Sequence, residues 1–313
     1  MDKKKVIKFI AITLGAAWIL QSIVGLLSLK IGGVTGTLIF TIGMSIVMFV
    51  PLISALIAKA DFKGMGWKPK FKGNIRWIFF ALWMPVVFSV LGLVIFFAVK
   101  PEIFSLDGSY ALLQASASAG MESEECLAQL EKSGLSLQMM MIISAIQMVT
   151  YAPFINMIVA LGEEVGWRGF LYPELKKKFS RVNTWLIGGA IWGAFHFPVM
   201  LINGYEYGKD YIGAPFLGLI VFVITCITWG MFHEVIYDKT KCIWFPALLH
   251  GSLNASANMF QFVLDGSKTD EISKFFILGP APHGLISIIP TIIIAVILAV
   301  IVLKEDRKGR TGS

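Results

Sequence analysis

Hydrophobic residues form long uninterrupted runs in this chain, and charged residues fall between them. A helix that crosses a bilayer needs about 20 largely apolar residues. The pattern therefore predicts an all-α polytopic membrane protein of about eight transmembrane helices, with residues 1–313 forming a single integral membrane domain. The eight charge-free runs that carry this prediction are residues 9–29, 38–58, 77–99, 137–162, 185–202, 214–232, 243–264 and 285–303.

Lys and Arg residues are distributed unevenly among the segments between these runs. If the eight runs alternate across the membrane, 21 of the 27 Lys and Arg residues lie on the side that carries both termini. Short basic loops usually face the cytoplasm. The asymmetry predicts a multi-pass protein of the cell membrane with both termini in the cytoplasm. It also places the acidic segment 100–136 outside, where we expect a solvated linker.

Composition excludes several other classes of protein. Hydrophobic residues make up 56% of the chain and charged residues 15%, whereas soluble domains carry about 25% charged residues. The net charge of +7 comes from basic residues scattered over many loops, so we expect membrane lipids as partners and no nucleic acid. Segment 168–181 combines a spaced apolar stripe with basic residues, which predicts an amphipathic helix at the lipid head groups.

Some polar side chains lie inside or next to the apolar runs, where charge is costly and indicates function. Glu164 and Arg168 are four residues apart, so they can pair on one helix face as supporting residues. Glu163 then remains free to face a cavity. His250 and Asn254 have the same spacing, so two donors could converge on one oxygen. The full set is Glu163, Glu164, His196, His233, Glu234, His250 and Asn254.

Three motifs follow one another along the middle of the chain. Residues 163–168 read EEVGWR and fit EExxxR, Trp192 and His196 fit FxxxH with Trp in place of Phe, and His250 and Asn254 fit HxxxN. In type and order they resemble the motifs of the CAAX-protease and bacteriocin-processing family of intramembrane proteases. The family core resembles residues 137–264. The resemblance implies an eight-helix fold in which this segment, helices four to seven, is the catalytic core.

The resemblance also implies an activity, intramembrane peptide hydrolysis. It assigns Glu163 as the general base, with His196 holding the attacking water, and His250 and Asn254 as the oxyanion hole. General chemistry agrees, because a tetrahedral oxyanion needs preorganised donors and water needs a base. Two glycines, Gly189 and Gly193, would let a neighbouring helix approach closely and bring His196 towards the acids.

The implied substrate is membrane-associated or lipidated, either a CAAX-like protein or a bacterial signal or bacteriocin-type peptide, cut near the cytoplasmic face. A protein of another class remains as the alternative. It would be a non-catalytic immunity or peptide-binding protein, or a small transporter. The complete Glu/His/His/Asn set favours catalysis, because a binding protein would not need a base together with oxyanion donors.

Metal dependence is the second alternative that the sequence leaves open. His233 and the acid after it suggest the HExxH zinc motif, but Tyr237 stands where the second histidine belongs. We therefore expect His233 at the membrane interface. Zinc held by Glu163, His196 and His250 would satisfy the usual ligand count, and the family is often labelled metalloprotease. We favour no metal cofactor, because the assigned roles work without one.

Overall fold

The computed structural model describes residues 1–311, with side chains described as far as residue 306. Within that range the chain is helical and has no β-strand, and its one β-type pairing is an isolated bridge between Phe104 and Leu264. The all-α class is confirmed. Large apolar side chains remain exposed along the outer helices, as a lipid-facing surface requires. The chain is an integral membrane protein.

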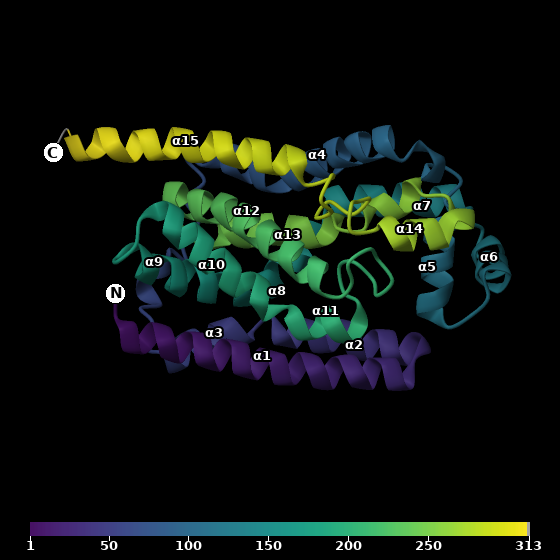
Figure 1. Ribbon diagram of the computed structural model, residues 1–313, viewed down its shortest axis with the longest axis horizontal. Helices are drawn as coiled ribbons and strands as arrows, with labels where there is room; N and C mark the ends of the chain where they lie inside the picture. Colours follow the sequence, from purple (N-terminus) through teal and green to yellow (C-terminus); the bar gives the residue numbers. More distant parts are fainter. Residues whose placement is uncertain (312–313) are drawn as a thin grey trace.

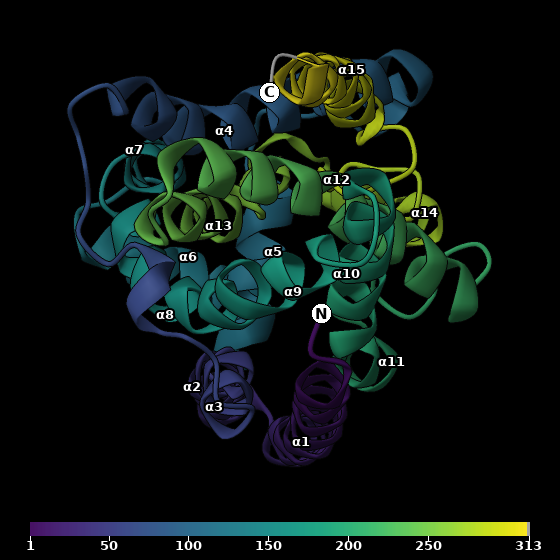
Figure 2. The same ribbon diagram turned by 90° about the vertical axis from the view of Figure 1, so that its left-hand side faces the viewer.

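The long helices form three layers, seen end-on in Figure 2. The middle layer, which carries all three motifs, packs between the other two. One outer layer holds α1 (Lys3–Ile31), α2 (Gly33–Val47) and α3 (Val50–Ile57). The middle layer holds α8 (Ala152–Gly166), α10 (Arg181–Phe195), α12 (Phe216–Thr240) and α13 (Trp244–Ser256), and the other outer layer holds α4 (Ile75–Val99), α15 (Ile289–Thr311) and, beside α4, α7 (Leu137–Val149).

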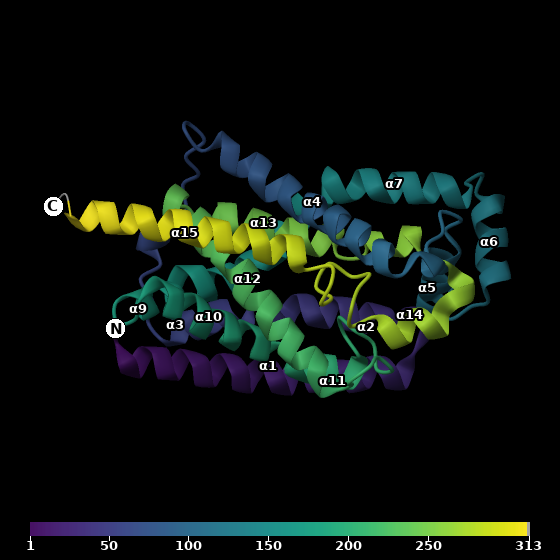
Figure 3. The same cartoon turned by 45° about the horizontal axis from the view of Figure 1, so that its top comes forward.

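The two ends of the bundle differ in what they carry (Figures 1 and 3). The terminal end holds both chain termini, η1 (Lys63–Met65) and α9 (Tyr172–Lys176). The distal end holds α5 (Ser109–Ala119), α6 (Ser123–Lys132), η2 (Pro101–Ile103), η4 (Met259–Val263), η5 (Gly266–Lys268) and α14 (Thr269–Phe275). The basic segments that the charge count grouped together therefore lie at one end.

Fewer helices qualify as membrane spans than the eight expected. Among the described residues, five helices are long and apolar enough to cross a membrane, or six if the bent pair of residues 137–149 and 152–176 is one span. The expected span at 243–264 is interrupted, because α13 ends at Ser256 and the short helix η4 follows. The run at 285–303 lies mostly in α15, which begins only at Ile289. Eight apolar runs therefore do not make eight uniform spanning helices.

Segment 100–136 contains two helices, α5 and α6, and forms a cap that is more ordered than the expected solvated linker with one short helix, although α6 has no buried residue. Its first helix, α5, is tied to other parts of the distal end: Thr37 of α2 donates to the Ser118 carbonyl at 3.0 Å, and the Gly266 amide donates to the Ser109 hydroxyl at 2.7 Å. Asp107 accepts from the hydroxyl and amide of Ser109 at the start of α5, and these bonds lower the pKa of Asp107. Such tertiary bonds have no periodic signature in the sequence.

The surface helix expected at 168–181 forms only in part. Residues Trp167–Leu171 form a π-helical turn, η3, and α9 ends at Lys176. Arg168 is completely buried and Leu175 nearly so. A buried guanidinium needs a partner, and the acid four residues earlier supplies one. The first half of this segment therefore belongs to the protein interior.

Candidate functional site

Glu163 lies near the end of α8 with its carboxylate held by two indoles. The Nε1 of Trp167 donates to Glu163 Oε2 at 2.9 Å, and the Nε1 of Trp192 donates to the same oxygen at 2.7 Å. Glu163 is 1% exposed. Neutral donors stabilise a buried carboxylate without neutralising its charge. Both bonds use Oε2, so Oε1 is available to the cavity that Glu163 lines.

Glu164 joins the first and third motifs. Its Oε1 accepts from Arg168 Nη1 at 2.9 Å, so the expected pair within one helix is confirmed. The same oxygen lies 2.8 Å from the Nδ1 of His250 on α13. This second contact was missed, because it joins residues 86 positions apart. It fixes the imidazole with Nδ1 towards Glu164, which leaves Nε2 for the cavity.

His196 lies at a break between α10 and α11 (Phe197–Asn203). Pro198 has no amide hydrogen and cannot bond the Ala194 carbonyl, as a continuous helix would require. The Trp18 indole donates to that carbonyl instead, at 2.9 Å. Gln21, which is completely buried, donates to the Phe195 carbonyl at 2.7 Å and accepts from the Val199 amide at 3.3 Å.

These hydrogen bonds from α1 stabilise the break between α10 and α11. The Nδ1 of His196 then lies 3.0 Å from the Trp192 carbonyl, so Nδ1 donates and Nε2 is left free. Neither Trp18 nor Gln21 carries a charge, which is why a search for ionisable residues inside the apolar runs did not find them. The sequence feature that could have indicated this support was a single glutamine, Gln21, within the first apolar run.

Close helix packing brings the motifs together. A Cβ atom on Gly189 would lie 2.4 Å from the Cα of Ile227, so α10 meets α12 backbone to backbone. A Cβ atom on Gly251, inside the HxxxN motif, would lie 2.4 Å from the Pro153 carbonyl oxygen of α8. The close approach expected from the GxxxG pair is confirmed, and α12 is the helix that approaches.

A cavity of about 620 Å³ is lined by Glu163, His196, His250 and Asn254. The four residues come from α8, the α10–α11 break and α13, so the fold brings together all four residues predicted to be catalytic. Their chemical roles stay predictions. The supporting residues Glu164 and Arg168 lie behind the cavity wall, completely buried.

The cavity extends towards the distal end. Its lining includes Tyr110 and Gln114 of α5, Ser273 of α14, and Phe276 directly after α14. Among the described residues, none of those that line it belongs to α9 or to the basic loop 59–76. The lining of the cavity therefore continues towards the end of the bundle opposite the termini.

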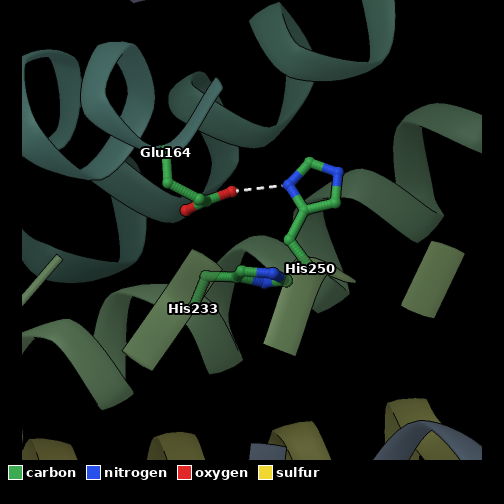
Figure 4. A group of neighbouring side chains, drawn as sticks. All are labelled: Glu164, His233 and His250. Carbon is green, nitrogen blue, oxygen red and sulfur yellow. Dashed lines mark hydrogen bonds and ion pairs between the residues drawn. The ribbon is translucent and has the colours of Figure 1, made fainter. Parts of the chain in front are cut away.

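A group of three side chains could hold a metal ion, and it differs from the expected set. Ligand atoms of Glu164, His233 and His250 all lie within 4.8 Å of one another (Figure 4). The described residues contain no such group built from Glu163 and His196. Zinc takes three ligands of this kind, but the guanidinium of Arg168 already pairs with the same Glu164 oxygen that bonds His250.

His233 lies in the protein interior, whereas the sequence analysis placed it at the membrane interface. It is completely buried, its ring packs edge-on against Trp192 and His250 with centroids 5.5 and 5.7 Å away, and its Nδ1 lies 2.7 Å from the Trp229 carbonyl. The next residue, Glu234, pairs with Lys176 at 2.7 Å towards the terminal end. Side chains of neighbouring residues point different ways around a helix, which separates these two environments.

Comparison with known proteins agrees with the position of this site. A model of the type II CAAX prenyl endopeptidase Rce1-like family matches residues 145–256. Because of this match, residues 145–256 are referred to below as the Rce1-like segment. "CAAX prenyl protease 2" of Methanococcus maripaludis is 25% identical over 133 residues, which cover 41% of this chain and 47% of that protein. The match thus spans about half of the curated relative. The Rce1-like segment contains every predicted catalytic residue and excludes α1, α4 and the distal cap.

Proposed function

We propose that this chain is an intramembrane endopeptidase that hydrolyses a peptide bond with water activated by Glu163. The observation that supports this function is the cavity that Glu163, His196, His250 and Asn254 line jointly. A base, a second imidazole and two oxyanion donors around one space are what peptide hydrolysis by water requires. The Rce1-like match over the same residues also supports it.

In the proposed reaction, Glu163 Oε1 takes a proton from a water molecule that His196 Nε2 holds as acceptor. The hydroxide oxygen forms a bond to the carbonyl carbon of the scissile peptide, and the carbonyl oxygen becomes an oxyanion. Asn254 donates a hydrogen bond to that oxygen. Glu163 then delivers its proton to the leaving nitrogen as the C–N bond breaks.

His250 adds the second donor only when it carries a positive charge. Its Nδ1 hydrogen bonds to Glu164 at 2.8 Å, so the neutral ring would present Nε2 as an acceptor. The imidazolium donates from both nitrogens, and the contact with Glu164 holds Nδ1 so that Nε2 faces the cavity. Glu164 therefore orients His250 in addition to pairing with Arg168. No step here requires a metal cofactor.

The substrate class follows from the location of the cavity inside a membrane protein. We propose a membrane-associated or lipidated peptide, CAAX-like or of the bacterial signal or bacteriocin type, that reaches the cavity from the distal end. We further propose the cell membrane as the location and the cytoplasm as the side of both termini. An externally applied thiol reagent should then not label Lys68→Cys in intact cells.

The deciding experiment compares the wild type with Glu163→Gln, which keeps the size of the side chain and removes its basicity. Purified proteins in lipid nanodiscs are given a membrane peptide fraction, and the products are identified by mass spectrometry. We expect Glu163→Gln to lower the rate by about 10²–10⁴. Glu124→Gln, on the exposed surface of α6, is the matched control. Identical product sets for all three proteins would favour a peptide-binding protein.

A further inference from the structure

A second acid, Glu206, faces the candidate active site from outside the three motifs. It lies in the loop that follows α11, and it lines the large cavity together with Glu163. It also lines a smaller cavity of about 100 Å³ that His196, His250 and Asn254 share. Glu206 is therefore close enough to the reacting groups to contact the same substrate.

The backbone of Glu206 adopts a conformation that glutamate rarely takes. Its φ angle is +77°, in the left-handed region that costs an ordinary residue about 1 kcal/mol or more. His283 holds it there, with Nε2 at 3.0 Å from the Glu206 carbonyl oxygen and 3.1 Å from its Oε2. Tyr207 in turn donates to the His283 carbonyl at 2.9 Å. Two loops from distant parts of the sequence thus fix one carboxylate at the cavity wall.

The cavity is acidic and lacks a strong cation. Among the described residues, its lining contains Glu163 and Glu206 but no lysine or arginine. Lys209 and Lys274 are close in sequence to lining residues, yet both are exposed and neither lines the cavity. The imidazole of His283 is the one side chain, in the part of the chain that the structure describes, that pairs with Glu206. A negative charge enclosed within a membrane protein is costly unless it is compensated.

We propose that Glu206 forms a subsite for a basic side chain, lysine or arginine, of the peptide substrate. The ammonium or guanidinium group would pair with the Glu206 carboxylate, beside the rings of Tyr205 and Phe222, which line the same small cavity and offer cation–π contacts. This inference rests on the proposed peptidase function and specifies its substrate. It predicts a bond cut within a few residues of a basic side chain.

The same lining disfavours a free carboxylate near the reacting groups. A substrate cut only a few residues before its C-terminus would place its terminal carboxylate close to the scissile bond. Two glutamates would repel that group, and the described lining offers no arginine or lysine to bind it. An internal bond of a basic peptide fits these charges better.

The test measures binding separately from cleavage. Probes are synthetic peptides with one acyl anchor, identical except for lysine, glutamine or glutamate at a scanned position. Their affinity for Glu163→Gln protein in nanodiscs is measured by fluorescence anisotropy. We expect the lysine peptide to bind about tenfold tighter than the glutamine peptide at one position, as for a partly buried ion pair. Adding Glu206→Gln should remove that preference.

Three further variants guard against an indirect effect of misfolding. Glu206→Asp keeps the charge and tolerates a positive φ better, so it should retain part of the preference. Glu206→Lys should reverse it in favour of the glutamate peptide. Glu124→Gln, an exposed acid on α6, should change nothing. A preference that survives Glu206→Gln, or the absence of any preference in the starting protein, would overturn the subsite.

Cleavage of the same peptides by the protein with Glu163 intact distinguishes the two proposals. Lysine preference in binding without any cleavage would refute the peptidase and leave the subsite standing. Cleavage that is indifferent to lysine would refute the subsite and leave the peptidase standing. If both hold, Glu206→Gln should raise the KM for the lysine peptide and leave its kcat nearly unchanged.

Discussion

Replacing Trp192 by phenylalanine tests how the candidate base is held. Phenylalanine is the aromatic residue expected at this position of the motif, and its ring can still lie over Arg168, whose guanidinium carbon is 4.4 Å from the Trp192 ring centroid. The change removes the indole donor that bonds Glu163 Oε2 at 2.7 Å. It therefore isolates one hydrogen bond to a buried carboxylate.

The size of the effect can be worked from that bond. A hydrogen bond to a charged group contributes about 1.5–3 kcal/mol, and the smaller ring leaves a gap that costs about 1 kcal/mol more. The free energy of unfolding should fall by about the sum of these two contributions. Because Trp167 still holds Oε2, the carboxylate should lose its orientation only in part. We expect kcat to fall by about tenfold to a hundredfold, the usual effect of a small misplacement, with little change in KM.

Trp185→Phe is the matched control. Trp185 lies on the same helix, is equally buried, and its indole donates to Glu234 Oε2 at 2.9 Å, away from the cavity. Thermal unfolding in detergent should show that both variants lose stability, the control somewhat less because Lys176 also pairs with Glu234. Turnover should fall in Trp192→Phe alone. Equal turnover in the two variants would refute the positioning of Glu163 by Trp192.

Three further predictions concern other parts of the site. Asn254→Ala should lower kcat by about 10²–10³ at unchanged substrate affinity, as loss of an oxyanion donor does; a rise in KM alone would make Asn254 a binding residue. Gln21→Leu should leave two backbone groups at the helix break unpaired, at a cost of about 2–5 kcal/mol, and hydrogen exchange at the Val199 amide should accelerate; unchanged exchange and activity would show that the break needs no support. Activity should survive dialysis against a strong chelator; stoichiometric zinc with chelator-reversible inactivation would contradict the metal-free reaction.

The sequence predicted the parts of this protein that repeat or that follow a local spacing. Long apolar runs identified the membrane helices, and the i,i+4 pair of Glu164 and Arg168 formed as its spacing indicated. The apolar runs do not correspond one to one with long helices, because hydropathy does not register where a helix breaks, as after Ser256. Residues that act through tertiary contacts escaped notice. Gln21 and Glu206 have no partner nearby in the chain, and their environment exists only once distant segments have packed.

The support that α1 gives to the helix break has a consequence for how this protein can be divided. The Rce1-like segment begins at residue 145, whereas Trp18 and Gln21, which bond the carbonyls next to His196, lie far before it. A fragment of residues 145–256 would retain every motif and lose these donors. We expect the helix break at Pro198 to lose its fixed geometry in such a fragment, because the Ala194 and Phe195 carbonyls would have no donor from α1, and His196 would lose its fixed position at the cavity. The segment that carries the motifs thus depends on α1 for its structure. A chimaera that exchanges catalytic segments between relatives should exchange the first helix with them.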